Sequence, residues 1–187
     1  MRPVGRRATA AGAPTRGDAA PIGGDVARAA LRRFASGVTV LTVADGGLAY
    51  GTTVSALVAV SREPLVLGAC LRASSSFTRL VRRASMFSVN VLRADQARVA
   101  ARFADPLRRP GPSQFASLAW RTDPVTGAPL VEDCLAHLSC RMNGCVPVGD
   151  HDVIIAEVID GCPSTGTPLL SFAGQLHSAP MARVEKE

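Results

Sequence analysis

Three consecutive serines, Ser74-Ser75-Ser76, form the strongest local candidate for a binding site in this sequence. Phe77, Leu80, Val81 and Ala84 follow at helical spacing, so we expect the serines to lie at the N-terminus of a helix. Exposed backbone N–H groups and the helix dipole favour an anion at such a place, and the hydroxyl groups can add hydrogen bonds. A phosphate group would suit the site. Ordinary N-capping by one serine explains the same pattern equally well.

A second candidate is the segment Gly51-Thr52-Thr53-Val54-Ser55, in which small hydroxylated residues follow a glycine within a predicted strand. Small side chains let a flat ligand approach the backbone donors and acceptors of a strand. Threonine and serine are also common in ordinary strands, so this segment alone does not establish a site.

His151 follows the turn residues Gly149 and Asp150 and opens a predicted strand. A histidine in this position is either a turn residue or a group at the mouth of a site, and the spacing does not separate the two. His137 shares a predicted strand face with Ser139 and Arg141, which we interpret as a face toward solvent. The sequence has no GxSxG, HExxH, P-loop or GxGxxG motif, so serine hydrolysis and zinc chemistry have no motif to support them.

Composition indicates one globular domain. Of 187 residues, 47% are hydrophobic and 19% are charged. No apolar run approaches the roughly 20 residues that span a bilayer, so we expect no membrane association. Residues 1–24 carry arginines without an apolar stretch behind them, which argues against a secretory signal. We therefore predict a disordered basic tail over 1–24, a domain over 25–178 and a short tail over 179–187, in a cytoplasmic protein.

The net charge of +6 raises the possibility of nucleic-acid binding. Half of this charge lies in residues 1–24, and the rest is interleaved with acidic residues. The chain has one Trp and one Tyr, too few for the aromatic platforms that accompany basic patches in such proteins. A small nucleic-acid-binding barrel therefore remains only a remote alternative, and we expect no nucleic-acid partner.

The cysteines argue against a disulfide framework and against a metal site. They are odd in number and contain no CxxC pair. We interpret them as small apolar residues in a reducing compartment. They are Cys70, Cys134, Cys140, Cys145 and Cys162.

The order of predicted elements favours an antiparallel, mainly β fold. Short helices are expected at 25–34 (capped by Asp25), 74–84 and 95–103 (capped by Asp95), and strands at 37–43, 48–60, 64–71, 86–92, 135–142, 151–159 and 169–176. Asp45-Gly46-Gly47 predicts a hairpin turn, and Gly51 a bulge or a point of close approach. Because no strand–helix–strand rhythm appears, we predict a closed or nearly closed barrel with peripheral helices.

In this order, several segments resemble the flavin reductase-like family, the short-chain reductases of two-component monooxygenases. The segments that carry the resemblance are 31–40, 51–56, 60–67, 87–92 and Gly149-Asp150-His151 through Glu157-Val158, with Arg102-Phe103-Ala104 and Pro168-Leu169-Leu170 between and after them. The resemblance covers about residues 26–174. It implies an FMN-binding split β-barrel, antiparallel and Greek-key-like, with short peripheral helices.

The resemblance also implies a function. A member of this family is an NAD(P)H:flavin oxidoreductase that reduces FMN or FAD with NADH or NADPH. It supplies the reduced flavin to a partner flavin-dependent monooxygenase, in secondary metabolism or aromatic hydroxylation. It is a homodimer with the flavin near the subunit interface.

By the same resemblance, particular residues take particular roles. The strand of Thr52 should hold the flavin, with Thr53, Val54 and Ser55 facing the isoalloxazine and Cys70 and Leu71 along the ring system. Ser74, Ser75 and Ser76 should bind the flavin phosphate, and Phe103 should pack near it. His151 should lie near the nicotinamide.

The chain departs from the family pattern in three places. Ser55 and Ala56 stand where Asn and Ser are usual, and Pro64 stands alone where two prolines are usual. Ala173-Gly174-Gln175-Leu176 replaces a frequent Arg-Gly-Arg-Tyr. The last departure supports an alternative, a split-barrel protein that binds FMN for electron transfer or flavin storage without a nicotinamide site.

Overall fold

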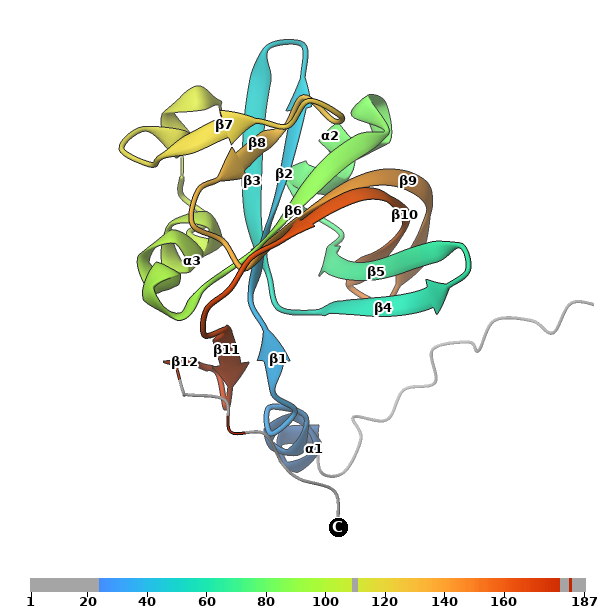
Figure 1. The fold of residues 1–187 in the computed structure, drawn as a ribbon. Coiled ribbons are helices and arrows are strands. Elements are labelled where there is room, and N and C mark those ends of the chain that lie inside the picture. Colours follow the sequence, from blue (N-terminus) through green and yellow to red (C-terminus); the bar gives the residue numbers. More distant parts are fainter. Residues whose placement is uncertain (1–23, 109–110, 179–181, 183–187) are drawn as a thin grey trace, which may run out of the picture.

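A seven-stranded antiparallel sheet forms the centre of the molecule (Figure 1). The structure is a computed structural model and describes residues 24–108, 111–178 and 182. The predicted N-terminal tail, except Gly24, and the predicted C-terminal tail, except Ala182, lie outside these residues. The strands, in their order across the sheet, are β3 (Leu48–Val54), β2 (Thr39–Asp45), β6 (Met86–Val91), β9 (Ala136–Val148), β10 (His151–Pro163), β5 (Leu65–Arg72) and β4 (Leu57–Arg62). The mainly β, antiparallel fold class is confirmed.

The two edge strands of this sheet, β3 and β4, are neighbours in the sequence. Only Ser55 and Ala56 connect them, so the sheet curls until its first and last strands meet at one corner. The carbonyl of Ala56 accepts a hydrogen bond from the Cys70 N–H at 2.9 Å, which holds the corner against β5. The sequence predicts one strand over 48–60 that is long enough to bend; the chain does bend at Ser55 and Ala56, but the two parts are separate strands at opposite edges of the sheet.

The hairpin between β2 and β3 has the predicted turn. Gly46 and Gly47 occupy its two central positions with φ of +57° and +82°. Positive φ at both positions is the requirement of a type I′ turn, whose twist matches that of the paired strands. This turn sets the register that pairs Thr42 with Gly51 and Thr39 with Val54.

Two helices cover the sheet. Helix α2 (Ser76–Ala84) buries Phe77 and Val81 in the core inside the curled sheet, against Phe87 of β6. Helix α3 (Ala97–Ala104) buries Phe103 in a second apolar cluster, with Phe115 of the 3₁₀ turn η2 (Pro112–Phe115). The positions of α2 and α3 matter most for function, because α2 begins beside the end of β5 and α3 packs on β3.

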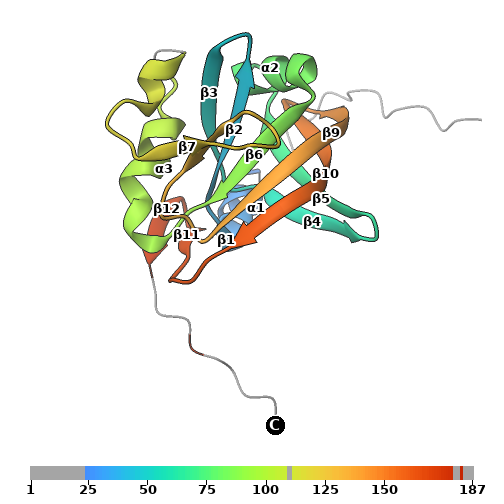
Figure 2. The same cartoon turned by 45° about the horizontal axis from the view of Figure 1, so that its top comes forward.

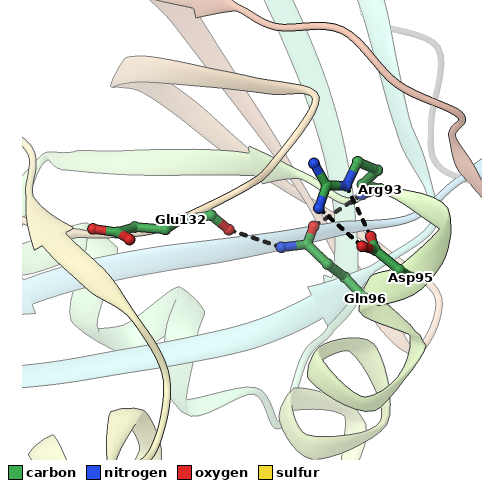
Figure 3. Close-up of polar contacts among 4 residues, drawn as sticks. All are labelled: Arg93, Asp95, Gln96 and Glu132. Carbon is green, nitrogen blue, oxygen red and sulfur yellow. Dashed lines mark hydrogen bonds and ion pairs between the residues drawn. The ribbon is translucent and has the colours of Figure 1, made fainter.

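The start of α3 is fixed by a polar cluster that the sequence did not indicate (Figure 3). The predicted N-cap Asp95 is wrong, because its carboxylate accepts two hydrogen bonds from the Arg93 guanidinium, at 2.9 and 2.8 Å. The Gln96 side chain instead accepts from the Arg93 N–H at 2.9 Å and donates to the Glu132 carbonyl at 2.8 Å. The short 3₁₀ turn η1 (Ala94–Gln96) and α3 are thereby tied to the chain that follows β8 (Pro129–Val131).

A small hairpin of β7 (Trp120–Thr122) and β8 lies over β2 and β6, and no strand was predicted there (Figure 2). It makes the solvent-facing prediction for His137 and Ser139 wrong. His137 Nε2 lies 2.8 Å from the Val131 carbonyl, and the buried Ser139 hydroxyl donates to Asp123 at 2.7 Å. Arg141, farther along the same strand, is exposed as predicted.

A second, three-stranded sheet lies below the first in Figure 1. It contains β1 (Ser36–Gly37), β11 (Leu169–Phe172) and β12 (Gln175–Ser178). The predicted closing strand over 169–176 is thus two strands, which turn at Ala173 and Gly174 with φ of +52° and +80°. Helix α1 (Gly24–Leu31) ends before the predicted residue 34 and has no buried residue. In the described part of the chain, no helix is both long and apolar enough to span a membrane.

Candidate functional site

A cleft of about 770 Å³ opens where β3 and β5 diverge from the corner at Ser55 and Ala56. The end of β5, the start of α2 and the end of α3 complete its walls. The cleft brings together every site residue that the sequence analysis named. These are Thr52, Thr53, Val54, Ser55, Cys70, Leu71, Ser74, Ser75, Ser76, Phe103 and His151.

Six further residues line the same cleft and were not predicted. They are Tyr50, Ala56, Arg72, Ala104, Pro106 and Arg108. Ala56, Arg72 and Ala104 directly adjoin predicted site residues and Tyr50 lies two residues before Thr52, so a wider window would have included them. Pro106 and Arg108 lie in a loop without periodicity, and only the tertiary fold brings them to the cleft.

The outer edge of β3 presents backbone groups on the cleft side. Gly51 shows the direction, because its N–H donates to Gln114 Oε1 at 3.1 Å and its carbonyl accepts from Arg108 at 2.7 and 3.1 Å. Both groups therefore point away from β2. Alternate residues of an antiparallel strand point their backbone groups the same way, so the N–H and C=O of Thr53 also point away from β2. This edge offers a donor and an acceptor to a flat ligand.

The side chain of Thr53 binds helix α3 and not the strand edge. Its hydroxyl donates to the Ala100 carbonyl of α3 at 2.7 Å. This bond occupies the hydroxyl proton and holds α3 against β3. Thr53 is therefore placed to offer its backbone, and not its hydroxyl proton, to a ligand.

The buried ring of Phe103 lies directly against Gly51, which confirms the close approach predicted at that glycine. Phe115 packs on the ring at a centroid distance of 5.2 Å. The two aromatic rings and the Thr53 bond fix α3 on β3, and they set the width of this end of the cleft.

The side chains of the three serines differ in their hydrogen bonds. Ser75 is the N-cap of α2, and its hydroxyl accepts from the Phe77 N–H at 3.2 Å, so the N-capping interpretation is right for this residue. The Ser76 hydroxyl accepts from Arg79 at 3.3 Å. Within the described residues, the Ser74 side chain makes no hydrogen bond. The first turn of α2 carries no acidic residue, so the helix dipole and the neighbouring hydroxyls favour an anion there.

The charge of the cleft is positive. Arg72 and Arg108 line it, and no aspartate or glutamate is among the described residues that do. The Arg108 guanidinium stacks over the Tyr50 ring at 4.9 Å and donates to the Tyr50 hydroxyl at 2.7 Å. A cation held in this way retains its charge and a fixed direction, which suits recognition of a phosphate.

His151 stands at the mouth of the cleft beside Asp150. Its Nδ1 lies 2.8 Å from Asp150 Oδ1, and this hydrogen bond is the first of the causes that lower the pKa of Asp150. The Asp150 carbonyl also accepts from the Ala73 N–H at 3.0 Å, which ties the turn to the chain just before the three serines. His151 is thus held by the turn and still presents its ring to the cleft.

The buried cysteines Cys134 and Cys140 behave as the sequence analysis expected. Burial raises the pKa of the Cys134 thiol to about 11 and that of Cys140 to about 12, so both stay protonated and apolar at neutral pH. All five cysteines are free. Only Cys70 lines the cleft.

Comparison with known proteins gives the family. The flavin reductase like domain model matches residues 31–180. An NADPH-flavin oxidoreductase from Streptomyces viridifaciens is 42% identical over 151 residues, which are 80% of this chain and 78% of that protein. The reductase component of a 4-nitrophenol 4-monooxygenase/4-nitrocatechol 2-monooxygenase from Rhodococcus opacus is 34% identical and covers 79% of this chain and 77% of its own.

Among solved structures, the NADH:FAD oxidoreductase SgcE6 of Streptomyces globisporus C-1027 superposes with a TM-score of 0.79 at 29% identity. The superposition covers 89% of this chain and all of that chain. The family model spans the central sheet and both helices that form the cleft, and the similar proteins extend over the same region. The chain therefore belongs to the flavin reductase like family.

Proposed function

We propose that this chain binds FMN or FAD in the cleft between β3 and β5, reduces it with NADH or NADPH, and supplies the reduced flavin to a flavin-dependent monooxygenase. The observation that carries the proposal is the cleft itself. It combines a free strand edge, a helix N-terminus with three serines and two arginines within one cavity. Its relatives include an NADPH-flavin oxidoreductase and a monooxygenase reductase component, which support this function over a flavoprotein without a nicotinamide site.

The residues present fit a flavin. A cavity of about 770 Å³ lies in the usual range for small-ligand sites, which is roughly 300–1,000 Å³. Val54, Leu71 and Phe103 supply apolar surface for a planar ring, and the backbone of Thr53 supplies a donor and an acceptor for its polar edge. Ser74, Ser76 and the N-terminus of α2 would hold the phosphate, with Arg72 and Arg108 adding positive charge.

The flavin, when bound, supplies the redox chemistry by accepting a hydride from the nicotinamide. The chain then has three tasks. The β3 edge orients the flavin ring, the serines and arginines hold its phosphate, and His151 positions the hydride donor at the open mouth. None of these tasks requires a side chain to transfer a proton, which agrees with the lack of an acid–base motif in the sequence.

We further propose that the protein is a homodimer through the outer face of the sheet formed by β4, β5, β10 and β9. Val58, Val60, Val146 and Val148 are each more than half exposed there. The side chains of Val58 and Val60 lie next to Gly68, where a Cβ atom would be 3.2 Å from Val60 and 3.4 Å from Val58. Monomeric proteins rarely expose so continuous an apolar face.

The same face reaches the cleft. Val153 lies opposite both Cys70 and Val146, so the three side chains share one side of the sheet, and Cys70 also lines the cleft. A second copy seated on the face would therefore border the flavin. As a cytoplasmic protein, the dimer would share a compartment with its nicotinamide donors.

Two measurements test the function together. Titration of FMN and FAD should quench flavin fluorescence, and NADH or NADPH should be oxidised in the presence of added flavin. If flavin binds but neither nucleotide is oxidised, the protein is a flavoprotein without a nicotinamide site. If neither flavin binds and nucleic acid binds in a salt-sensitive way, the flavin function is wrong.

The dimer is tested by light scattering of the wild type and of Val58→Arg. An arginine on this face should shift the mass from dimer to monomer. Arg121→Glu, on the exposed strand β7, is the control and should leave the mass unchanged. A monomeric wild-type protein would contradict the proposal.

A further inference from the structure

A second, smaller pocket adjoins the cleft. It has a volume of about 280 Å³ and is lined by Arg102, Arg108, Ser113 and Gln114; we call it the Gln114 pocket. Arg108 lines both cavities, so the two are neighbours across one side chain. Of these residues, the proposed function uses only Arg108, so it assigns no ligand to this pocket.

Gln114 gives the pocket an unused hydrogen-bond donor. The residue is only 3% exposed, and its Oε1 accepts from the Gly51 N–H at 3.1 Å. That bond fixes the orientation of the amide, because only the oxygen can accept. Nε2, also buried, has no hydrogen-bond partner among the described residues. Buried polar groups are rarely left unpaired, so an acceptor is expected at this place.

The other residues of the pocket also donate. The Arg102 guanidinium uses one N–H for the Ser113 carbonyl at 3.2 Å, which leaves its other N–H groups available. Arg108 uses four of its five N–H groups for Gly51, Tyr50 and the Asp105 carbonyl, which fixes its guanidinium and leaves one N–H and its positive charge for the pocket. No carboxylate lines the pocket within the described part of the chain. Two guanidinium groups, an amide and a hydroxyl select a ligand that carries several charged oxygens.

We propose that the Gln114 pocket binds the phosphate group by which FAD differs from FMN or NADPH differs from NADH, while the rest of that cofactor occupies the cleft. This inference rests on the proposed function, which places the first phosphate at Ser74–Ser76. The second phosphate has two possible sources. FAD carries one phosphate more than FMN, and NADPH carries a 2′-phosphate that NADH lacks. The pocket therefore makes the enzyme discriminate either between the two flavins or between the two nicotinamide donors.

Two substitutions test the pocket. Arg102→Gln removes a cation from a half-buried side chain and keeps a terminal amide that can still donate to the Ser113 carbonyl. Gln114→Glu keeps an oxygen for the Gly51 N–H and replaces the unused donor with a carboxylate that repels phosphate. The control is Arg98→Gln, which removes the same charge from the same helix, from an exposed residue that lines neither cavity.

The measurements are the Kd of FMN and FAD by fluorescence quenching, and the KM of NADH and NADPH with FMN saturating. Loss of a charged hydrogen bond should weaken the affected ligand about tenfold or more. FAD weakened with FMN unchanged identifies the second flavin phosphate. KM raised for NADPH and unchanged for NADH identifies the 2′-phosphate. The inference requires the same discrimination from both variants, and none from Arg98→Gln.

Equal effects on FMN and FAD together with equal effects on NADH and NADPH overturn the inference, as does no effect of either variant. Melting temperatures of the variants identify any loss that comes from unfolding. Failure of the wild-type protein to bind FMN is a different result, because it contradicts the proposed function itself.

Discussion

A Cβ atom added to Gly51 would lie 2.5 Å from Cε1 of the Phe103 ring and 2.6 Å from Cδ1. Strand β3 and helix α3 therefore pack at a distance that only a glycine permits at this position. Gly51 also lies beside the cleft, and Phe103 forms part of its wall. The contact between these two residues links the packing of α3 to the shape of the candidate site.

Gly51→Ala should therefore destabilise the protein and weaken flavin binding together. The Phe103 ring must move, and overpacking of this kind typically costs about 1–3 kcal/mol. Chemical denaturation and FMN titration measure the two effects. Gly37→Ala is the matched control, because an added Cβ there meets no atom within 4 Å. If Gly51→Ala behaves like the control, the close packing of α3 on β3 is not required.

The division of tasks among the serines predicts two different losses. Ser74→Ala with Ser76→Ala should weaken FMN by about 1.5–3 kcal/mol and leave riboflavin almost unchanged, because only FMN carries the phosphate. Equal weakening of both ligands would place the phosphate elsewhere. Isothermal titration with the two flavins makes the comparison.

Ser75→Ala should act mainly on folding. Its hydroxyl caps α2, and loss of an N-cap typically costs about 0.5–2 kcal/mol of stability. Thermal unfolding of the variant measures this cost. A Ser75→Ala protein with wild-type stability and greatly reduced FMN affinity would show that this hydroxyl binds the ligand and does not cap the helix.

His151→Ala should raise the KM for NADH while flavin affinity stays close to wild type. The ring stands at the mouth of the cleft, where the nicotinamide is proposed to dock. His151→Asn keeps a hydrogen-bonding group beside Asp150, so its KM for NADH should lie between those of the wild type and of His151→Ala. Unchanged NADH kinetics in both variants would return His151 to a purely structural role in the turn.

Asp123 should make folding stability depend on acid pH. Burial opposes its ionisation, but hydrogen bonds from Ser88, the Val125 N–H, Ser139 and Thr126 outweigh burial, so its pKa lies below the ordinary value. A carboxyl with a lowered pKa in the folded state contributes stability that is fully present above its unfolded pKa. That contribution is lost as the pH falls below about 4.

Asp123→Asn isolates this contribution. The variant should lose about 1–3 kcal/mol at neutral pH, because an amide cannot accept all of these hydrogen bonds. Its stability should also fall less steeply than that of the wild type as the pH drops below about 4. Urea unfolding at several pH values gives both quantities, and parallel curves for the two proteins would contradict this role for Asp123.

Local chemistry explains which elements the sequence predicted. Gly46 and Gly47 specify their turn, and Ser75 specifies the start of α2, because the residues that decide each feature are adjacent. The order of segments indicated the family, which added Cys70, Leu71 and Phe103 to the candidates that local patterns had already given. The β7–β8 hairpin could not be predicted in this way. Its strands have three residues each, and it is held by Asp123 through contacts to Ser88 and Ser139, far away in the sequence.

The site shows the same limit. Thr53 lines the cleft, but its strand pattern could not reveal that the hydroxyl is bonded to Ala100 of α3. Arg108 and Gln114 lie in or beside a loop without periodicity, so their positions depend on how that loop packs on Gly51. Long-range hydrogen bonds of this kind leave no signal in a single sequence.

The two-residue link at Ser55 and Ala56 has a consequence for motion. In the described residues, β3 and β5 are connected through this corner and are not paired with each other along the cleft. The two walls of the cleft can therefore move apart without breaking a strand pair. A ligand that contacts both β3 and β5 would link the two walls and should suppress this movement. Amide hydrogen exchange at Thr53 and Cys70 should then slow on flavin binding, while the β6–β9 pairing in the middle of the sheet keeps its own rate.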